Sequence, residues 1–153
     1  MTLLLATFGV ALASAWIPII PIEGYLAGAV TQTSLSPLLL AGSATVGQMA
    51  GKVAIFLLGR QSMQWPWLRK QLARHKAERW VERLTTALNR RPFAADGIVL
   101  GSAFIGIPPF AVVSVLAGQL RVQLARFVLW GTVGRFARFA AVALGVEQVL
   151  SVI

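Results

Sequence analysis

The segment "PIIPIEGYLAGAV", residues 18–30, places two prolines and the carboxylate of Glu23 inside an apolar run. Proline removes a backbone hydrogen-bond donor and ends a helix, and an ionisable side chain is costly to place in lipid. A second segment, "GIPPFAVVSVLAGQL" at residues 106–120, also places a proline pair before a short apolar return that contains Ala-Gly. A polar connection and one long apolar stretch follow each segment. We therefore interpret the chain as two repeats of a broken helical hairpin followed by a membrane-spanning helix.

The composition is that of a membrane protein. Hydrophobic residues make up 57% of the 153 residues and charged residues only 12%, about half the share in soluble domains. The mean hydropathy is +0.74. The first 22 residues carry no charge, and neither do residues 24–51, and such runs exceed the roughly 20 apolar residues that cross a bilayer. We predict an all-α, multi-pass integral membrane protein that forms one domain over residues 1–153.

Basic residues concentrate in the middle of the chain. Nine of the 14 Lys and Arg residues lie in residues 60–91, between the first repeat (residues 1–59) and the second (residues 92–153). Positive charge between two apolar blocks is typical of a cytoplasmic loop, so the net charge of +9 does not indicate nucleic-acid binding. Apolar residues recur here at multiples of four, which predicts an amphipathic helix lying on the membrane: Leu68, Leu72, Trp80, Leu84 and Leu88. It either senses anionic lipid or only connects the repeats and holds the topology.

The broken segments are too short to cross the membrane twice. A helix over residues 110–120 would extend only about 16 Å, near half the hydrocarbon thickness, so we expect re-entrant hairpins whose tips lie near the midplane. The residues expected to form them are Pro18, Pro21, Gly28, Pro108, Pro109 and Gly118. The uncharged connection 31–36 fits the outside, whereas Arg121 and Arg126 place the matching connection inside. The repeats are then inverted, as in alternating-access transporters. Two full spans with kinks are the alternative.

The first residues also have features of a secretory signal. An apolar run at residues 3–12 precedes Ala13-Ser14-Ala15, which is similar to a cleavage site. No positive residue precedes this run, and cleavage would remove half of an element that has a counterpart in the second repeat. We expect the segment to be retained.

The segments "PIIPIEGYLAGA", "GSATVGQMAGKVAIFLLGR" and "GIPPFAVVSVLAGQLRVQLARFVLWGTVGRFARF" together resemble the DedA family, whose VTT domain is also called SNARE-associated, and in particular its short bacterial members. The resemblance implies a bacterial inner-membrane protein that moves phospholipid or undecaprenyl phosphate between leaflets. It places Glu23 where the family's first hairpin carries its acid. The proton-linked members have a second acid in this half and arginines in the second hairpin; residues 24–51 here contain no acid and residues 102–118 no arginine.

Four ionisable residues are expected at membrane depth and form the candidate substrate-binding set: Glu23, Lys52, Arg135 and Arg138. Arg135 and Arg138 share a helical face, and a pair of guanidinium groups suits a lipid phosphate. Glu23 either balances these arginines until a phosphate binds or forms a fixed internal ion pair; a third option is that Arg138 extends outward. We expect Lys52 to extend toward the cytoplasmic end of its helix near Gly59.

Two further features concern packing. Gly47 and Gly51 form a GxxxG pair, which we expect to pack against a hairpin rather than to form a dimer. Asp96 lies near the start of the second repeat, where it can cap a helix. His75 lies in the basic segment and is expected to be a solvated surface residue.

The leading functional hypothesis is a lipid transporter or scramblase that binds anionic phosphate headgroups. The alternatives are a proton- or ion-coupled transporter of small solutes and a non-catalytic membrane interaction protein. An enzyme is not expected, because one histidine, five scattered acids and no cysteine supply neither a nucleophile with its base nor a metal site. We predict no cofactor and no metal. The identity of the lipid, proton coupling and homo-oligomer formation stay open.

Overall fold

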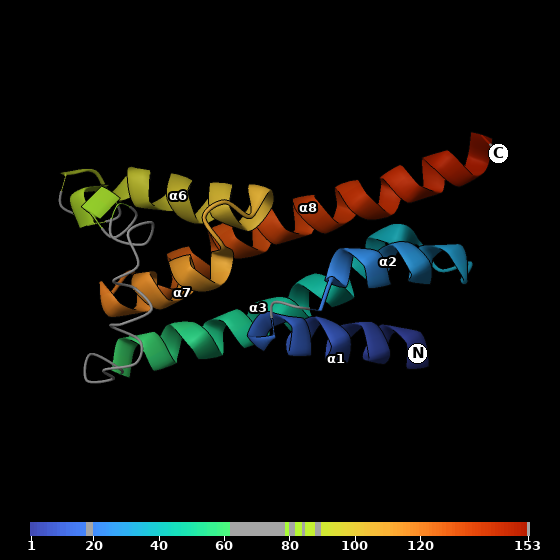
Figure 1. Ribbon diagram of the computed structural model, residues 1–153, viewed down its shortest axis with the longest axis horizontal. Coiled ribbons are helices and arrows are strands. Elements are labelled where there is room, and N and C mark those ends of the chain that lie inside the picture. Colours follow the sequence, from blue (N-terminus) through green and yellow to red (C-terminus); the bar gives the residue numbers. More distant parts are fainter. Residues whose placement is uncertain (18–19, 62–78, 80–81, 84, 88–89, 153) are drawn as a thin grey trace. The chain divides into compact units, whose positions relative to one another are not determined.

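A computed structural model describes residues 1–17, 20–61, 79, 82–83, 85–87 and 90–152. All regular structure in these residues is helical (Figure 1). The principal helices are α1 (Thr2–Trp16), α2 (Ile22–Thr31), α3 (Pro37–Gln61), α6 (Pro92–Ile105), α7 (Phe110–Gln119) and α8 (Leu124–Val152). Two short helices and one long helix thus occur twice along the chain. The all-α fold class and the two long apolar helices are confirmed.

The breaks between the short helices lie at the predicted prolines. Pro21 is the N-cap of α2, and Pro109 is the N-cap of α7. Before the second break, α6 ends at Gly106 with φ of 86°, a left-handed conformation that glycine adopts without a steric penalty. Within each pair the two helices run in opposite directions and contact each other, α1 with α2 and α6 with α7 (Figure 1). Pro18 lies outside the described residues.

The two long helices match the predicted spans. By length and apolar composition, α3 with 25 residues and α8 with 29 residues are able to cross a membrane. Both α3 and α8 also extend beyond the roughly 20 residues that a bilayer requires. Of the other predicted hairpin residues, Pro108 lies in the break between α6 and α7, and Gly28 and Gly118 lie near the ends of the short helices α2 and α7. Arg121, with φ of 55°, turns the chain before α8 begins.

The predicted amphipathic helix is described only in part. Residues 79, 82–83, 85–87 and 90 are helical. The apolar residues that would define its membrane-facing side, Leu68, Leu72, Trp80, Leu84 and Leu88, lie outside the described residues, as does His75. The membrane-surface role of this segment therefore stays a prediction.

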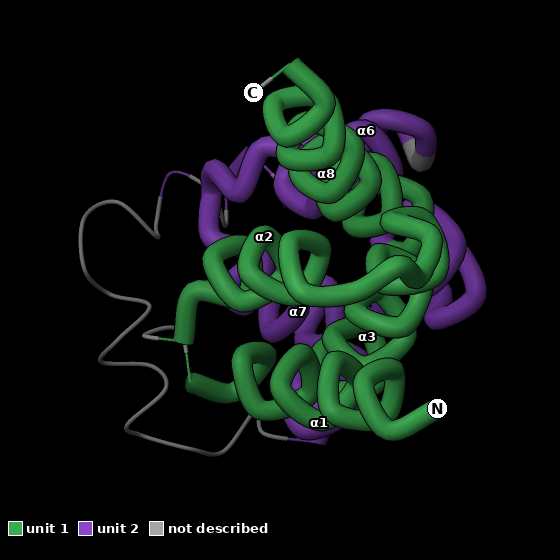
Figure 2. The backbone as a smooth tube through the Cα atoms, turned by 90° about the vertical axis from the view of Figure 1, so that its right-hand side faces the viewer, with its two compact units in different colours: residues 1–52, 132–153 green, residues 53–131 purple. Residues whose placement is uncertain are grey.

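The chain divides into two compact units, coloured separately in Figure 2. Unit 1 consists of residues 1–52 and 132–153, and unit 2 of residues 53–131. Both boundaries fall inside long helices, α3 and α8. Each unit therefore takes residues from both predicted repeats.

Unit 1 is built around a close contact between α1 and α3. A Cβ atom added at Gly47 would collide with the backbone of Phe8, and one added at Gly51 would collide with the side chain of Ala15. Ser43 also donates a hydrogen bond of 2.6 Å to the carbonyl of Leu4. The GxxxG pair packs against a hairpin helix, as predicted. A cluster of apolar side chains forms the core: Ala11, Ile22, Leu26, Leu40, Ala44, Phe139 and Ala143.

Unit 2 contains an aromatic stack and a second glycine contact. The ring of Phe127 lies 4.7 Å from that of Phe56 and 5.7 Å from that of Phe110, centroid to centroid. A Cβ atom at Gly118 would meet the backbone of Phe56, and one at Gly59 would meet that of Val115. Here α7 approaches α3 as closely as glycine allows.

Asp96 does not cap a helix, contrary to the prediction. Pro92 occupies the first turn of α6 and Arg91 is the N-cap, so Asp96 lies inside the helix. This start is physically reasonable, because proline at the first helical position loses no hydrogen bond and has a helical φ. The Asp96 carboxylate instead accepts a 2.7 Å hydrogen bond from Arg126, whose guanidinium lies 5.7 Å from the centre of the Phe93 ring.

Candidate functional site

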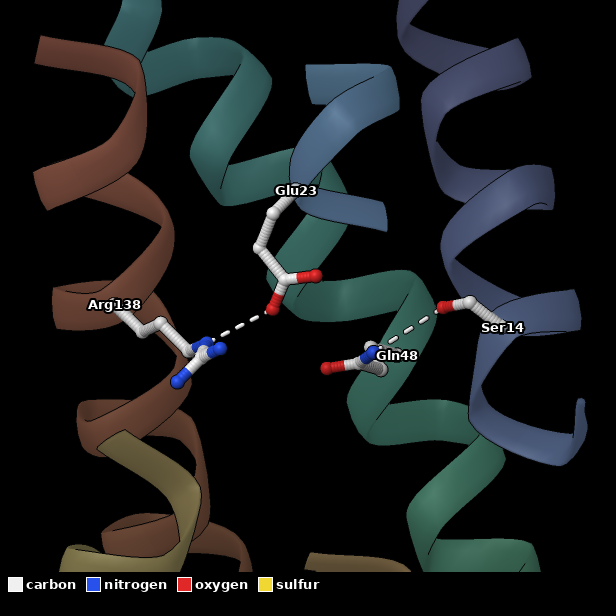
Figure 3. A network of polar contacts seen from close by, with 4 residues as sticks. All are labelled: Ser14, Glu23, Gln48 and Arg138. Carbon is white, nitrogen blue, oxygen red and sulfur yellow. Dashed lines mark hydrogen bonds and ion pairs between the residues drawn. The ribbon is translucent and has the colours of Figure 1, made fainter. Parts of the chain in front are cut away.

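An ion pair joins the start of α2 to the middle of α8. Nε of Arg138 donates to Oε1 of Glu23 over 2.9 Å, although the two residues are 115 positions apart in the chain (Figure 3). Both side chains are about one-third exposed, at 29% and 33%. Glu23 occupies the first turn of α2, where a negative charge is favoured by the helix dipole. The predicted contact between these residues is present, and its role in binding substrate stays a prediction.

Arg135 lies one turn before Arg138 on α8 and is almost fully buried, at 8% exposure. It lies near enough to Arg138 and Glu23 to interact electrostatically with both. Residues three apart on a helix lie on the same face. The two guanidinium groups and the carboxylate therefore belong to one cluster within unit 1.

Lys52 does not extend toward the C-terminal end of α3, contrary to the prediction. Its side chain is buried, and Nζ donates a 2.7 Å hydrogen bond to the carbonyl of Ala15. The last carbonyl groups of a helix have no partner within the helix and attract cations; α1 ends at Trp16, so Ala15 offers such a carbonyl. Lys52 also interacts electrostatically with Arg135.

All four predicted binding residues thus lie in unit 1, where we call them the charge cluster: Glu23, Lys52, Arg135 and Arg138. The cluster contains three cationic groups and one carboxylate, an excess of positive charge in a largely buried place. Such a site suits an anion, and guanidinium groups bind phosphate oxygens in pairs.

Sequence reasoning missed a hydrogen-bond chain beside this cluster. Nε2 of Gln48 on α3 donates to Oγ of Ser14 on α1 over 3.1 Å (Figure 3). The Ser14 hydroxyl donates in turn to the carbonyl of Ala11 over 2.8 Å. Gln48 directly follows Gly47. A polar residue next to a predicted close contact between helices was the one feature of the sequence that could have indicated these hydrogen bonds.

Acidic and histidine side chains do not gather anywhere in the described residues in a group of three or more able to hold a metal ion. The polar side chains described above in unit 1 carry guanidinium, ammonium, carboxylate, amide and hydroxyl groups.

Residues 20–148 match the family model of the VTT domain, which covers most of the chain. Comparison with curated proteins and with solved structures finds no match. The matched region contains the whole charge cluster and both proline breaks except Pro18. The chain therefore belongs to the VTT-domain family of membrane proteins, the DedA or SNARE-associated family that its segments resemble.

Proposed function

We propose that this protein moves phosphate-bearing lipids, either phospholipid or polyprenyl phosphate, between the leaflets of a bacterial inner membrane. The observation that carries the proposal is the charge cluster, in which Arg138 bonds Glu23 at 2.9 Å with Arg135 and Lys52 buried alongside. Arg135 and Arg138 lie near the middle of α8, a helix long enough to span the membrane. Charges at such a depth are expensive and usually serve transport.

In this proposal the Glu23 carboxylate neutralises Arg138 while the site is empty. A lipid phosphate replaces the carboxylate, because its oxygens accept the same N–H donor and can engage the planar guanidinium group through two bonds. Arg135 adds a second guanidinium, and the lipid is released when Glu23 returns to Arg138. The positive excess of the cluster favours the phosphate, and the returning carboxylate keeps it from being held permanently.

In the same proposal, the short helices enter the membrane without crossing it. Helix α7 has ten residues, which corresponds to about 15 Å and is too short to cross the hydrocarbon layer. We propose that α1–α2 and α6–α7 are re-entrant hairpins of two inverted repeats. Irregular backbone at membrane depth is tolerated where it lines a cavity or is buried in protein.

The test is reconstitution of the purified protein into liposomes that carry a fluorescent phospholipid in one leaflet. We expect the lipid to leave that leaflet faster than in empty liposomes, and Arg135→Ala and Glu23→Gln to slow it at least tenfold. The matched control is Asp96→Asn/Arg126→Gln, which removes the ion pair of unit 2 and leaves the charge cluster intact. This control is expected to move lipid at the wild-type rate.

Two results would contradict the proposal. Wild-type rates in a correctly inserted Arg135→Ala protein would remove the cluster from the transport path. No movement of phospholipid or polyprenyl phosphate, with or without a pH gradient, would leave a membrane interaction protein in which these charges only hold helices together.

A further inference from the structure

The carbonyl oxygen of Gln48 is a buried polar atom that the proposed cycle does not yet use. The side chain lies beside the contact of α1 with α3 and is only 4% exposed. Within the part of the chain that the structure describes, no group donates a hydrogen bond to its Oε1 atom. Buried polar atoms almost always have a hydrogen-bond partner. This acceptor is therefore open to a donor that a ligand brings.

Ser14 determines which way the Gln48 amide faces. The Ser14 hydroxyl already donates its hydrogen to the carbonyl of Ala11 over 2.8 Å. Oγ therefore offers only lone pairs to Gln48 and must receive an N–H group. The reversed amide would bring two acceptors together. The Gln48 carbonyl consequently points away from α1, to the side on which Glu23 and Arg138 lie (Figure 3).

We propose that Gln48 Oε1 accepts a hydrogen bond from the headgroup of the transported lipid, so that the site selects phospholipids with an N–H or O–H donor beside the phosphate. The inference rests on the proposed function and specifies its substrate class. The oxygens of a phosphodiester and of a glutamine amide are all acceptors, so they cannot satisfy each other. The donor must come from the headgroup substituent, such as the ammonium of ethanolamine.

Glu23 strengthens this selection. Once the phosphate has replaced it at Arg138, its carboxylate becomes an acceptor on the same side of the site as Gln48 (Figure 3). An ammonium group would then find one charged and one neutral acceptor. A choline group carries three methyl groups on nitrogen and no N–H, so it would leave Gln48 Oε1 without a donor.

The experiment compares three lipids that differ only in methylation of the headgroup nitrogen: phosphatidylethanolamine, its N,N-dimethyl derivative and phosphatidylcholine. All carry the same fluorescent acyl chain, and the rate in empty liposomes is subtracted. We expect the wild-type protein to move phosphatidylethanolamine at least fivefold faster than phosphatidylcholine, with the dimethyl lipid between them. A site with a buried acceptor discriminates against a ligand that lacks the matching donor.

The decisive variant is Gln48→Met, which keeps the length of the side chain and removes its carbonyl. We expect its rate for phosphatidylethanolamine to fall at least threefold toward that for phosphatidylcholine, whose rate stays unchanged; the preference that remains is the part contributed by Glu23. The matched control is Thr45→Val on the same helix. Thr45 is buried as well, but its hydroxyl donates within α3 to Ala41 over 2.7 Å, so the preference should persist.

Equal wild-type rates for the three lipids would overturn the inference and leave lipid movement standing. A preference that survives undiminished in Gln48→Met would overturn it as well. Movement of none of the lipids would overturn the inference together with the proposed function. If Gln48→Met does not elute as a folded protein in detergent, the order of the three wild-type rates decides.

Discussion

Glu23 and Arg138 join α2 to α8, and a contact of this kind can serve as a support or as a site that opens. Each side chain is about one-third exposed, at 33% and 29%. In the proposed transport path the exposed parts of both side chains face water, where ion pairs contribute modestly to stability, on the order of 1 kcal/mol. So small a contribution makes the contact easy to open. A competing phosphate therefore has little stability to overcome.

A double-mutant cycle with Glu23→Gln, Arg138→Gln and the double variant separates the two roles. We expect each single variant to lower stability and the double variant to recover part of the loss, with a coupling of about 1 kcal/mol. Lipid movement should not recover, because the double variant still lacks a guanidinium for the phosphate. Unfolding in detergent measures the coupling, and the liposome assay measures movement. Recovery of both quantities together would show a purely structural contact.

The sequence was sufficient to select these two residues, because a charge inside an apolar run stands out. It was misleading for Lys52, whose distance to the end of α3 predicted an outward side chain. The deciding group was the Ala15 carbonyl at the end of α1, and its position depends on how α1 packs. The orientation of the Gln48 amide could not be predicted for the same reason, because it is determined by a hydrogen bond to Ser14 on another helix.

At the level of elements, the glycines of α3 determine how closely other helices approach. Gly47 faces the backbone of Phe8 so tightly that no side chain fits, whereas a Cβ atom at Gly42 meets nothing within 4 Å. The two positions lie on the same helix and differ mainly in this contact. They therefore form a matched pair for measuring how much the close contact between α1 and α3 contributes to the free energy of unfolding.

We predict opposite effects of alanine at these two positions. Gly47→Ala should destabilise the protein by about 1–3 kcal/mol, because the new methyl group forces α1 away from α3. Gly42→Ala should stabilise it by up to about 1 kcal/mol through the higher helix propensity of alanine. Unfolding of both variants in the same detergent measures the difference. Equal effects would show that α1 does not lie against α3 in solution.

The elements themselves were largely predictable. Pro21, Pro108 and Pro109 mark the breaks because proline cannot continue a helix from within, and unbroken apolar runs mark α3 and α8. The start of α6 was less clear: Asp96 was expected as a cap, but Pro92 begins the helix four residues earlier. The partner of Asp96 is Arg126, which lies 30 residues further along the chain. The spacing of residues within one helix cannot predict a contact between two different helices.

At the scale of the whole molecule, the orientation in the membrane depends on the basic segment at residues 60–91. The positive-inside rule predicts that this segment lies in the cytoplasm and that the uncharged connection at residues 31–36 lies outside. Both regions contain exposed described residues, Ser34 and Glu82. The chain contains no cysteine, so a single introduced thiol can be labelled without background.

We predict that Ser34→Cys reacts with a membrane-impermeant maleimide in intact bacterial cells. Glu82→Cys should react only after the membrane is permeabilised. The two variants serve as controls for each other, because expression and reagent are the same. Labelling in the reverse order would invert the proposed topology, and labelling of both in intact cells would place the basic segment outside.

The ion pair between Glu23 and Arg138 also has a consequence for biosynthesis. Its two partners are separated by 115 residues, so a ribosome adding about 5–20 residues per second needs on the order of ten seconds to deliver the second after the first. During that interval the nascent carboxylate has no guanidinium from α8 and must remain near water or the insertion machinery. Assembly of unit 1 is accordingly a late event, which waits for α8 to emerge even though α1, α2 and most of α3 were made first.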